Sequence, residues 1–280
     1  MTTVGEILRL GTRLLQAASS PSARLDAEVL LGHVLGLRRV DLYAYPDRTL
    51  TPEEEAAYQT LLERRSRQEP VSYLRQQKEF YGLTFFVDRR VLIPRPETEV
   101  LVERTLTRAQ EMGRADLVLA DIGTGSGCIA VALAWHLPGA RLYATDISPE
   151  ALEVAGENVR RHGLLERVTL LHGDLCAPLP EAVDLLVSNP PYTVWETLPA
   201  GITAYEPRVA LDGGADGLDI YRRLLPQVPS ALKAGGHALL EVGDGQARAV
   251  FALVEQVCPQ AARWTWPDDS GNERVVEFRP

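Results

Sequence analysis

The stretch LADIGTGSGCIA, residues 119–130, decides the expected fold of this chain. Its first apolar run ends at Asp121, a turn with glycine at every second position follows, and another apolar run starts at Cys128. Glycines let a backbone turn sharply and let a ligand approach it closely. In open α/β sheets, ligands bind just beyond the carboxyl ends of the strands. The stretch therefore predicts a strand, a ligand-binding turn and a helix in succession.

Runs typical of strands and helices alternate on both sides of this stretch. Strands are predicted at ADLVLADIG, ARLYATDIS, RVTLLHGDL, AVDLLVSNPP, GGHALLEVG and RVVEFRP, and the helices between them include GLDIYRRLLPQVPSAL and GQARAVFALVEQV. Such alternation is typical of a mostly parallel sheet with helices on both faces. We therefore expect an α/β domain over residues 94–280.

The first third of the chain has no strand pattern, and we expect a small helical bundle over residues 1–73. Its clearest helix start is at Thr51, where Pro52 takes the first helical position and Glu54 completes a capping box. Residues 74–93 include the run EFYGLTFFVDRRVLI, whose aromatic and β-branched residues predict a β-hairpin. This hairpin is expected to link the bundle to the α/β domain.

The composition excludes several classes of protein. The 280 residues carry a formal net charge of −9, whereas a protein that mainly grips duplex DNA normally carries the opposite sign. The three cysteines are far apart and form no CxxC pair, which favours a reduced, cytoplasmic protein without a metal site. The N-terminus has no long apolar run, so no membrane partner is expected. A monomer is the default expectation.

The glycine turn, which consists of Gly123, Thr124, Gly125, Ser126 and Gly127, indicates the kind of ligand. The dinucleotide-binding fingerprint has glycines at relative positions 1, 3 and 6. Here they take positions 1, 3 and 5. This departure favours the methyl donor S-adenosylmethionine over a pyrophosphate. A tight turn without a ligand is the alternative.

Acidic residues end the next two predicted strands. Asp146 follows Gly127 by 19 residues and is placed to accept hydrogen bonds from both hydroxyls of a ribose. Asp174 is placed to accept from an adenine amino group, and Leu175 to cover a face of the base. The alternative role of Asp146 is a helix N-cap. The alternative for Asp174 and Leu175 is an acid on a solvated turn beside a leucine of the core.

The fourth predicted strand ends in a corner formed by Asn189, Pro190, Pro191 and Tyr192. This NPPY sequence resembles the motif of methyltransferases that alkylate a planar nitrogen. The Asn189 side-chain oxygen and the Pro190 carbonyl can each accept one N–H of a target NH2 group, and the prolines fix the direction of that carbonyl. Tyr192 can pack on the flat target. We expect catalysis by positioning and electrostatics, although a proline-stiffened loop would have the same sequence.

Two further segments narrow the resemblance to one family. VLIPRPETE, residues 91–99, and YEPRVALDGGADGLDIYRRL, residues 205–224, together with the glycine turn and the NPPY corner, resemble the PrmC/HemK family of glutamine methyltransferases that act on peptide-chain release factors. The likeness covers essentially the whole chain. It implies a Rossmann-like class I methyltransferase domain with a seven-stranded sheet, in which one strand near the C-terminus is antiparallel.

The resemblance also implies an activity and a set of site residues. The family uses S-adenosylmethionine to methylate N5 of the glutamine in the Gly-Gly-Gln motif of release factors, which the helical domain would help to dock. The glycine turn matches the family's donor loop, Asp146 its ribose acid, and residues 189–192 its substrate clamp, with Asn189 also beside the donor. Leu175 stands where some members have an aromatic residue. The roles of Arg95, Glu97 and Glu206 stay open.

Two other functions compete with this interpretation. An adenine-N6 methyltransferase of DNA or RNA would share the NPPY corner and the donor loop, but it should show a basic face and a domain for base recognition. A non-catalytic binder that retains a nucleotide fold is the second alternative. Transfer of a labelled methyl group to a release factor or to DNA distinguishes the three.

Overall fold

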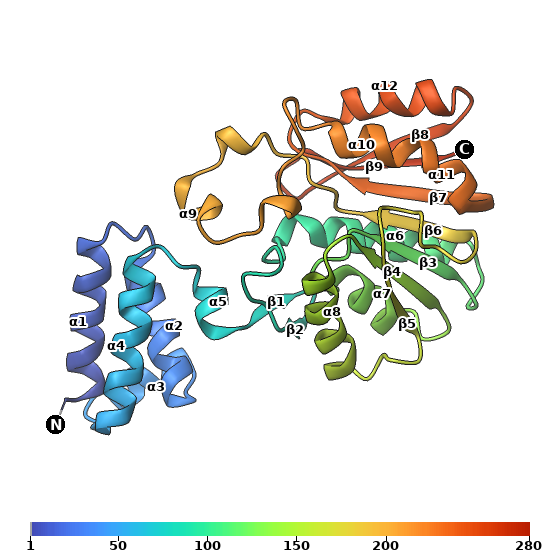
Figure 1. Ribbon diagram of the computed structural model, residues 1–280. Helices are drawn as coiled ribbons and strands as arrows, with labels where there is room; N and C mark the ends of the chain where they lie inside the picture. The colour runs from blue at the N-terminus through green and yellow to red at the C-terminus, as the bar shows by residue number, and fades with distance from the viewer. Residues whose placement is uncertain (1) are drawn as a thin grey trace. The chain divides into compact units, whose positions relative to one another are not determined.

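The computed structural model describes residues 2–280, which divide into a compact unit ending at Gln77 and another from Lys78 to Pro280 (Figure 1). Each unit has its own hydrophobic core. Among residues 2–280, no helix is long and apolar enough to cross a membrane. The domain boundaries expected at residues 73 and 93 remain a prediction.

The first unit is helical, as the sequence predicts. Its helices are α1 (Val4–Ala17), α2 (Ala23–Leu35), α3 (Arg39–Ala44), α4 (Pro52–Ser66) and α5 (Val71–Arg75). The capping box expected at Thr51 is present, and Pro52 begins α4. Tyr58 is fully buried and donates to the Ala27 carbonyl at 3.1 Å. Gly11 permits this packing, because a Cβ there would lie 2.4 Å from the Tyr58 hydroxyl.

The second unit is built on a sheet whose seven strands all lie within the described residues (Figure 1). They are β3 (Val118–Ile122), β4 (Arg141–Asp146), β5 (Val168–His172), β6 (Val183–Ser188), β7 (Leu232–Glu241), β8 (Ala262–Pro267) and β9 (Glu273–Arg279). Their order is β5-β4-β3-β6-β7-β9-β8, and β9 runs antiparallel to both of its neighbours. The α/β fold with one antiparallel strand near the C-terminus is therefore confirmed.

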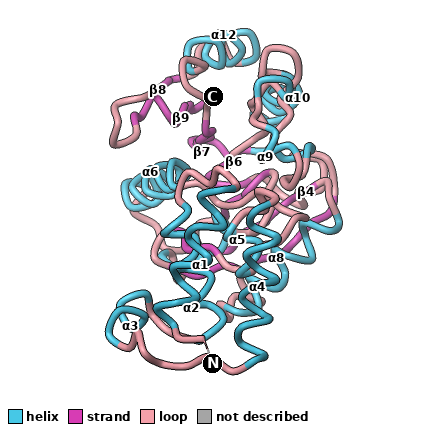
Figure 2. Tube along the Cα trace, turned by 90° about the vertical axis from the view of Figure 1, so that its left-hand side faces the viewer, coloured by secondary structure: helices cyan, strands magenta, loops and turns pink. Residues whose placement is uncertain are grey.

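Helices cover both faces of the sheet. They are α6 (Glu99–Glu111), α7 (Cys128–His136), α8 (Pro149–Arg161), α10 (Asp219–Leu224), α11 (Val228–Ala231) and α12 (Ala247–Val257). Strand β3 is buried on both sides, since Leu119 packs with α6 and α7 while Val118 and Ala120 pack with α10 and α12. Figure 2 shows strands β6 and β7 between α6 and α10.

Two details of the α/β unit differ from the sequence prediction. The single helix expected over GLDIYRRLLPQVPSAL is divided into α10, a 3-10 turn (Leu225–Gln227) and α11, because Pro226 and Pro229 cannot donate backbone hydrogen bonds. Strand β8 was not assigned by the pattern. It is an edge strand of mostly half-buried residues, so its side chains lack the apolar alternation of a covered strand.

The predicted hairpin is present as β1 (Lys78–Phe80) and β2 (Leu83–Phe85), which pair antiparallel. Phe80 and Phe85 are buried in the core that α6 and α7 form with the sheet. Just after β2, the side chain of Asn158 accepts from Phe86 N at 2.7 Å and donates to the carbonyl oxygens of Phe86 and Ser126. These bonds hold the segment that follows the hairpin beside the glycine turn.

Candidate active site

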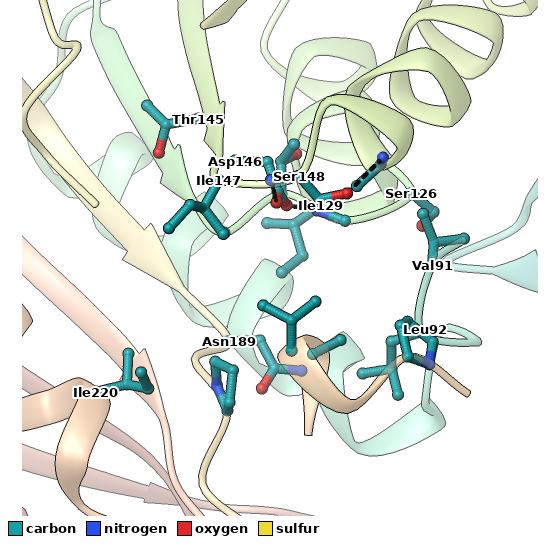
Figure 3. A pocket seen from close by; sticks show the side chains of 18 of the residues that line it. Val91, Leu92, Ser126, Ile129, Thr145, Asp146, Ile147, Ser148, Asn189 and Ile220 are labelled. Atoms are coloured by element: carbon teal, nitrogen blue, oxygen red, sulfur yellow. Dashed lines mark hydrogen bonds between the residues drawn. The ribbon is translucent and has the colours of Figure 1, made fainter. Parts of the chain in front are cut away.

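The carboxyl ends of the central strands gather polar residues at one edge of the sheet. Asp121 lies in β3, Asp146 ends β4, Asn189 follows β6 and Glu241 ends β7. Strands β4 and β6 lie on opposite sides of β3, so the direction in which successive strands are added to the sheet reverses at β3. A ligand crevice is expected at such a point. A cavity of about 170 Å³, the first cavity, opens at this edge (Figure 3).

The glycine turn lines one side of the first cavity. Gly123, Gly125 and Gly127 have φ of 76°, 55° and 78°, a region that side-chain-bearing residues rarely adopt. The backbone N–H groups of Gly123 and Thr124 both donate to the Thr145 carbonyl at 2.9 Å, which folds the turn over the end of β4. Every residue of the turn except Gly127 lines the cavity. Gly127 instead caps α7 and lies against Ala155.

The carboxylate of Asp121 binds the glycine turn through Thr124. One carboxylate oxygen accepts from the Thr124 hydroxyl at 2.6 Å and from Ala130 N at 3.2 Å. The other, Oδ1, is buried and has no hydrogen-bond partner within the described part of the chain. Burial raises the pKa of Asp121 to about 7, against the lowering effect of those hydrogen bonds. The sequence marked this residue only as the end of a strand.

Asp146 lies between the glycine turn and the loop before α8. Its Oδ2 accepts from Gly125 N at 2.8 Å, and its Oδ1 accepts from Ser148 N at 2.9 Å. Each carboxylate oxygen can accept a further hydrogen bond, and the residue lines the first cavity. Burial raises its pKa. The N-cap of α8 is Ser148, whose hydroxyl accepts from Ala151 N, so Asp146 does not have that alternative role.

Asp174 and Leu175, which the sequence assigns to a base-binding wall, both line the first cavity. Both oxygens of the Asp174 carboxylate lie 2.7 Å from Arg223 Nη2, an ion pair that the sequence did not predict. Leu175 has φ of 51°, in the left-handed region, and its carbonyl accepts from the Thr145 hydroxyl at 3.0 Å. A leucine in this conformation costs about 1–3 kcal/mol, which surrounding contacts must offset.

The corner of residues 189–192 separates the first cavity from a second one, also of about 170 Å³. Asn189 and Pro191 line both cavities, while Pro190 and Tyr192 line the second. Figure 3 shows Asn189 across the first cavity from Asp146. The Asn189 amide donates through Nδ2 to the Thr98 hydroxyl at 3.1 Å, which leaves Oδ1 to accept from a ligand.

Contacts to both the backbone and the side chain of Tyr192 hold it in place. Its carbonyl accepts from Gln246 Nε2 at 3.1 Å, and its hydroxyl donates to Glu241 Oε1 at 3.0 Å. A Cβ at Gly213 would lie 2.8 Å from the Tyr192 carbonyl carbon, and one at Gly217 would lie 2.3 Å from its oxygen. The segment DGGADG, residues 212–217, therefore needs glycine where the backbone of the corner passes against it.

A partly buried ion pair joins the two segments of residues 91–99 and 205–224. Arg95 Nη2 lies 2.6 Å from Glu206 Oε1, and Glu206 Oε2 accepts from Ile93 N at 3.1 Å. Glu206 is buried, and Arg95 lines both cavities. The pair thus holds the segment after α9 (Ala200–Thr203), whose Ile202 lines the second cavity, against the segment before α6. Glu97 is exposed.

The comparisons with known proteins agree with this architecture. A family model described as PrmC N-terminal domain matches residues 6–75, and one described as Methyltransferase small domain matches residues 97–203. The release factor glutamine methyltransferase of Geobacter sulfurreducens is 45% identical and aligns over 99% of this chain and 96% of its own. That of Moorella thermoacetica is also 45% identical, over 97% and 96%.

Among solved structures, a methyltransferase from Pyrococcus furiosus has a TM-score of 0.52 and 19% sequence identity. The match covers 72% of this chain and 90% of that one. At this identity the likeness supports the fold alone.

Replacing Asp146 tests the first cavity as a donor site. We expect Asp146→Ala to weaken binding of S-adenosylmethionine by roughly ten- to over a hundredfold, because a hydrogen bond to a charged group contributes about 1.5–3 kcal/mol. Isothermal titration of both proteins with S-adenosylmethionine measures the change. Equal affinities would show that Asp146 does not hold the donor.

Replacing Gly217 tests the close approach to Tyr192. Gly217→Ala introduces both a left-handed alanine and an overlap with the Tyr192 carbonyl, whereas Gly235→Ala introduces only the first. Gly235 has φ of 78°, and a Cβ there would meet no described atom within 4 Å. We expect the Gly217 variant to lose about 1–3 kcal/mol more unfolding free energy than the Gly235 control in urea denaturation. Equal losses would contradict the packing argument.

Proposed function

The chain belongs to the release factor glutamine methyltransferase family, and we propose that it methylates the side-chain amide nitrogen, N5, of the glutamine in the Gly-Gly-Gln motif of peptide-chain release factors. Its methyl donor is S-adenosylmethionine. The observation that carries the proposal is the position of the NPPY corner, which forms the wall between two cavities of similar volume and contributes Asn189 to both.

The residues around the first cavity fit an adenosyl group. The face of the glycine turn is open, since a Cβ on Gly123 or Gly125 would meet no described atom within 4 Å. We assign the ribose hydroxyls to the spare acceptor positions of Asp146, and the adenine to the wall formed by Asp174 and Leu175. Asp174 would then accept from the adenine amino group while it remains paired with Arg223. When bound there, S-adenosylmethionine supplies an electrophilic methyl group on a cationic sulfur.

The second cavity fits the side chain of a glutamine. Its wall combines the apolar side chains of Leu92, Leu198 and Ile202 with the corner. Apolar walls can pack on the methylene groups of the substrate side chain, and the corner meets its amide end. We place the ring of Tyr192, which lines this cavity, against the flat amide.

The corner activates the amide by orienting it. The lone pair of an amide nitrogen is delocalised, so the nitrogen is a weak nucleophile. We propose that Asn189 Oδ1 and the Pro190 carbonyl each accept one N–H of the glutamine, which turns the nitrogen lone pair toward the first cavity. The prolines fix the direction of that carbonyl, so little reorganisation is needed as the nitrogen becomes tetrahedral. Transfer forms the N–C bond, breaks the S–C bond and releases one amide proton to solvent.

The remaining assignments are also proposals. The helical first unit would help to dock the release factor, and the enzyme would act in the cytoplasm as a monomer. We expect no nucleic-acid substrate, because the net charge of −9 would repel a polyanion.

Transfer of a radiolabelled methyl group from S-adenosylmethionine tests the activity. We expect label on purified release factor and none on DNA, with mass spectrometry placing the added methyl on the glutamine of the Gly-Gly-Gln motif. Label on DNA alone, or on neither, would reject the proposal.

Replacing Asn189 tests the clamp. Asn189→Ala should lower transfer at least about 100-fold, because it removes an oriented acceptor at the reacting nitrogen, while leaving donor affinity largely unchanged. The Asp146→Ala variant is the matched comparison, since it should mainly weaken the donor. Full transfer activity in Asn189→Ala would remove the clamp from the mechanism.

A further inference from the structure

A buried carboxylate lies behind the NPPY corner and belongs to neither cavity wall. Glu241 ends β7 and is 0% exposed. Its Oε1 accepts from the Tyr192 hydroxyl at 3.0 Å. The Thr98 hydroxyl lies close enough to this carboxylate to lower its pKa, although Oε2 has no hydrogen-bond partner among residues 2–280. Two side chains that reach the corner therefore converge on one carboxylate.

Thr98 connects this carboxylate to the catalytic amide. It is 2% exposed, and its hydroxyl oxygen accepts from Asn189 Nδ2 at 3.1 Å. A threonine hydroxyl has one hydrogen to donate and two lone pairs that accept. An ionised carboxylate beside this hydroxyl can only accept, so it favours the orientation in which the Thr98 hydrogen points toward Glu241 and a lone pair is left for the Asn189 NH2 group.

The direction of these bonds fixes which end of the Asn189 amide faces the substrate. With Nδ2 bound to Thr98, the opposite atom, Oδ1, is presented for an N–H of the target. If the carboxylate were replaced by a donor, Thr98 could donate to Asn189 instead, and the amide could turn its NH2 group toward the target. Two N–H groups facing each other cannot form the required bond.

We propose that Glu241 is a positioning residue for methyl transfer, which acts through Thr98 to orient the Asn189 amide and through the Tyr192 hydroxyl to fix the corner. This inference rests on the proposed function. Glu241 touches neither substrate nor donor in this arrangement, so it acts only through the residues that do. A neutral side chain of the same shape would fill its space but would not impose the direction of the bonds.

Ionisation of Glu241 is costly to the fold. Burial raises its pKa to about 7 from an ordinary value of 4.5. The folded state therefore becomes less stable as the pH rises from 4.5 to about 7, because ionisation is harder in the folded than in the unfolded chain. The titratable and charged groups near enough to interact electrostatically with it are Glu97, Cys128, Tyr192, Tyr221 and Arg274. Burial raises the pKa of Cys128 to about 12 and also raises those of both tyrosines, so these three stay neutral near pH 7.

The test compares Glu241→Gln with wild type in the full-length protein. We expect kcat for release factor methylation to fall roughly 10- to 100-fold at pH 8, because a small misplacement of the Asn189 amide costs about that much in rate. The affinity for S-adenosylmethionine should stay within about twofold, because no donor contact changes. The melting temperature at pH 8 should equal or exceed that of wild type, since the variant removes a buried charge.

Two variants at Thr98 examine the same path without changing the charge. Thr98→Val removes the hydroxyl and should lower kcat by a similar factor, whereas Thr98→Ser retains it and should keep kcat within about threefold of wild type. Thr105→Val is the matched control, because Thr105 is a fully buried threonine of α6 whose hydroxyl bonds only to the Leu101 carbonyl among the described residues. It should retain wild-type kcat.

The pH profile adds a readout that a purely structural role would not move. In wild type, kcat should fall as the pH drops through about 7, because protonated Glu241 can donate to Thr98 and reverse the bonds. Asp121 titrates in the same range, so the difference between the wild-type and Glu241→Gln profiles is the quantity to measure. In Glu241→Gln, kcat should fall less steeply below pH 7 than in wild type, because no carboxylate is present at this position to be protonated.

The outcomes separate this inference from the proposed function. A wild-type enzyme that transfers no label to release factor contradicts the function and the inference together. An active wild type with unchanged kcat in Glu241→Gln overturns the inference alone. If Glu241→Gln does not fold, equal kcat in Thr98→Val and Thr98→Ser overturns the inference, and a loss confined to Thr98→Val supports it.

Discussion

The fixed position of the corner between the two cavities is the constraint on which the rest of this structure depends. A catalyst that works by orienting an amide gains little from a corner that can move, since a displacement of about 1 Å can cost a hundredfold in rate. The corner is accordingly held from several directions. Gln246 binds the Tyr192 carbonyl, Gly213 and Gly217 pack against its backbone, and Glu241 accepts from its hydroxyl.

Holding the site in this way places unfavourable groups in the interior. Asp121 and Glu241 are both buried, both have pKa values raised to about 7, and each keeps one carboxylate oxygen without a partner among residues 2–280. Leu175 adds a left-handed backbone at the wall of the first cavity. Perturbed acids and strained backbone are typical of functional sites, where precise placement offsets their cost in stability. The well-packed layers on both faces of the sheet supply that stability.

Local sequence was sufficient for the elements that carry the site. The glycine turn could be predicted because residues with side chains rarely adopt the left-handed backbone of its three glycines. The corner could be predicted because two successive prolines after an apolar run restrict the backbone. The alternation of elements gave the parallel sheet, and the edge of that sheet at which the polar residues meet follows from its topology. Edge strand β8 was not predicted, because half-buried strands leave a weak pattern. The division of the helix after residue 217 could have been predicted from Pro226 and Pro229, which cannot donate helical hydrogen bonds.

By itself, then, the sequence determined the fold class, the glycine turn, the strand-end acids and the corner, because each depends on residues that are adjacent or periodic in the chain. Only the tertiary structure decided how these parts are held together. Thr98 binds Asn189 across 91 positions, Arg95 pairs with Glu206 across 111, and Tyr192 reaches Glu241 across 49. No local pattern specifies such partners, because a hydrogen bond requires only that two groups meet in space, and the packing of the sheet brings them together.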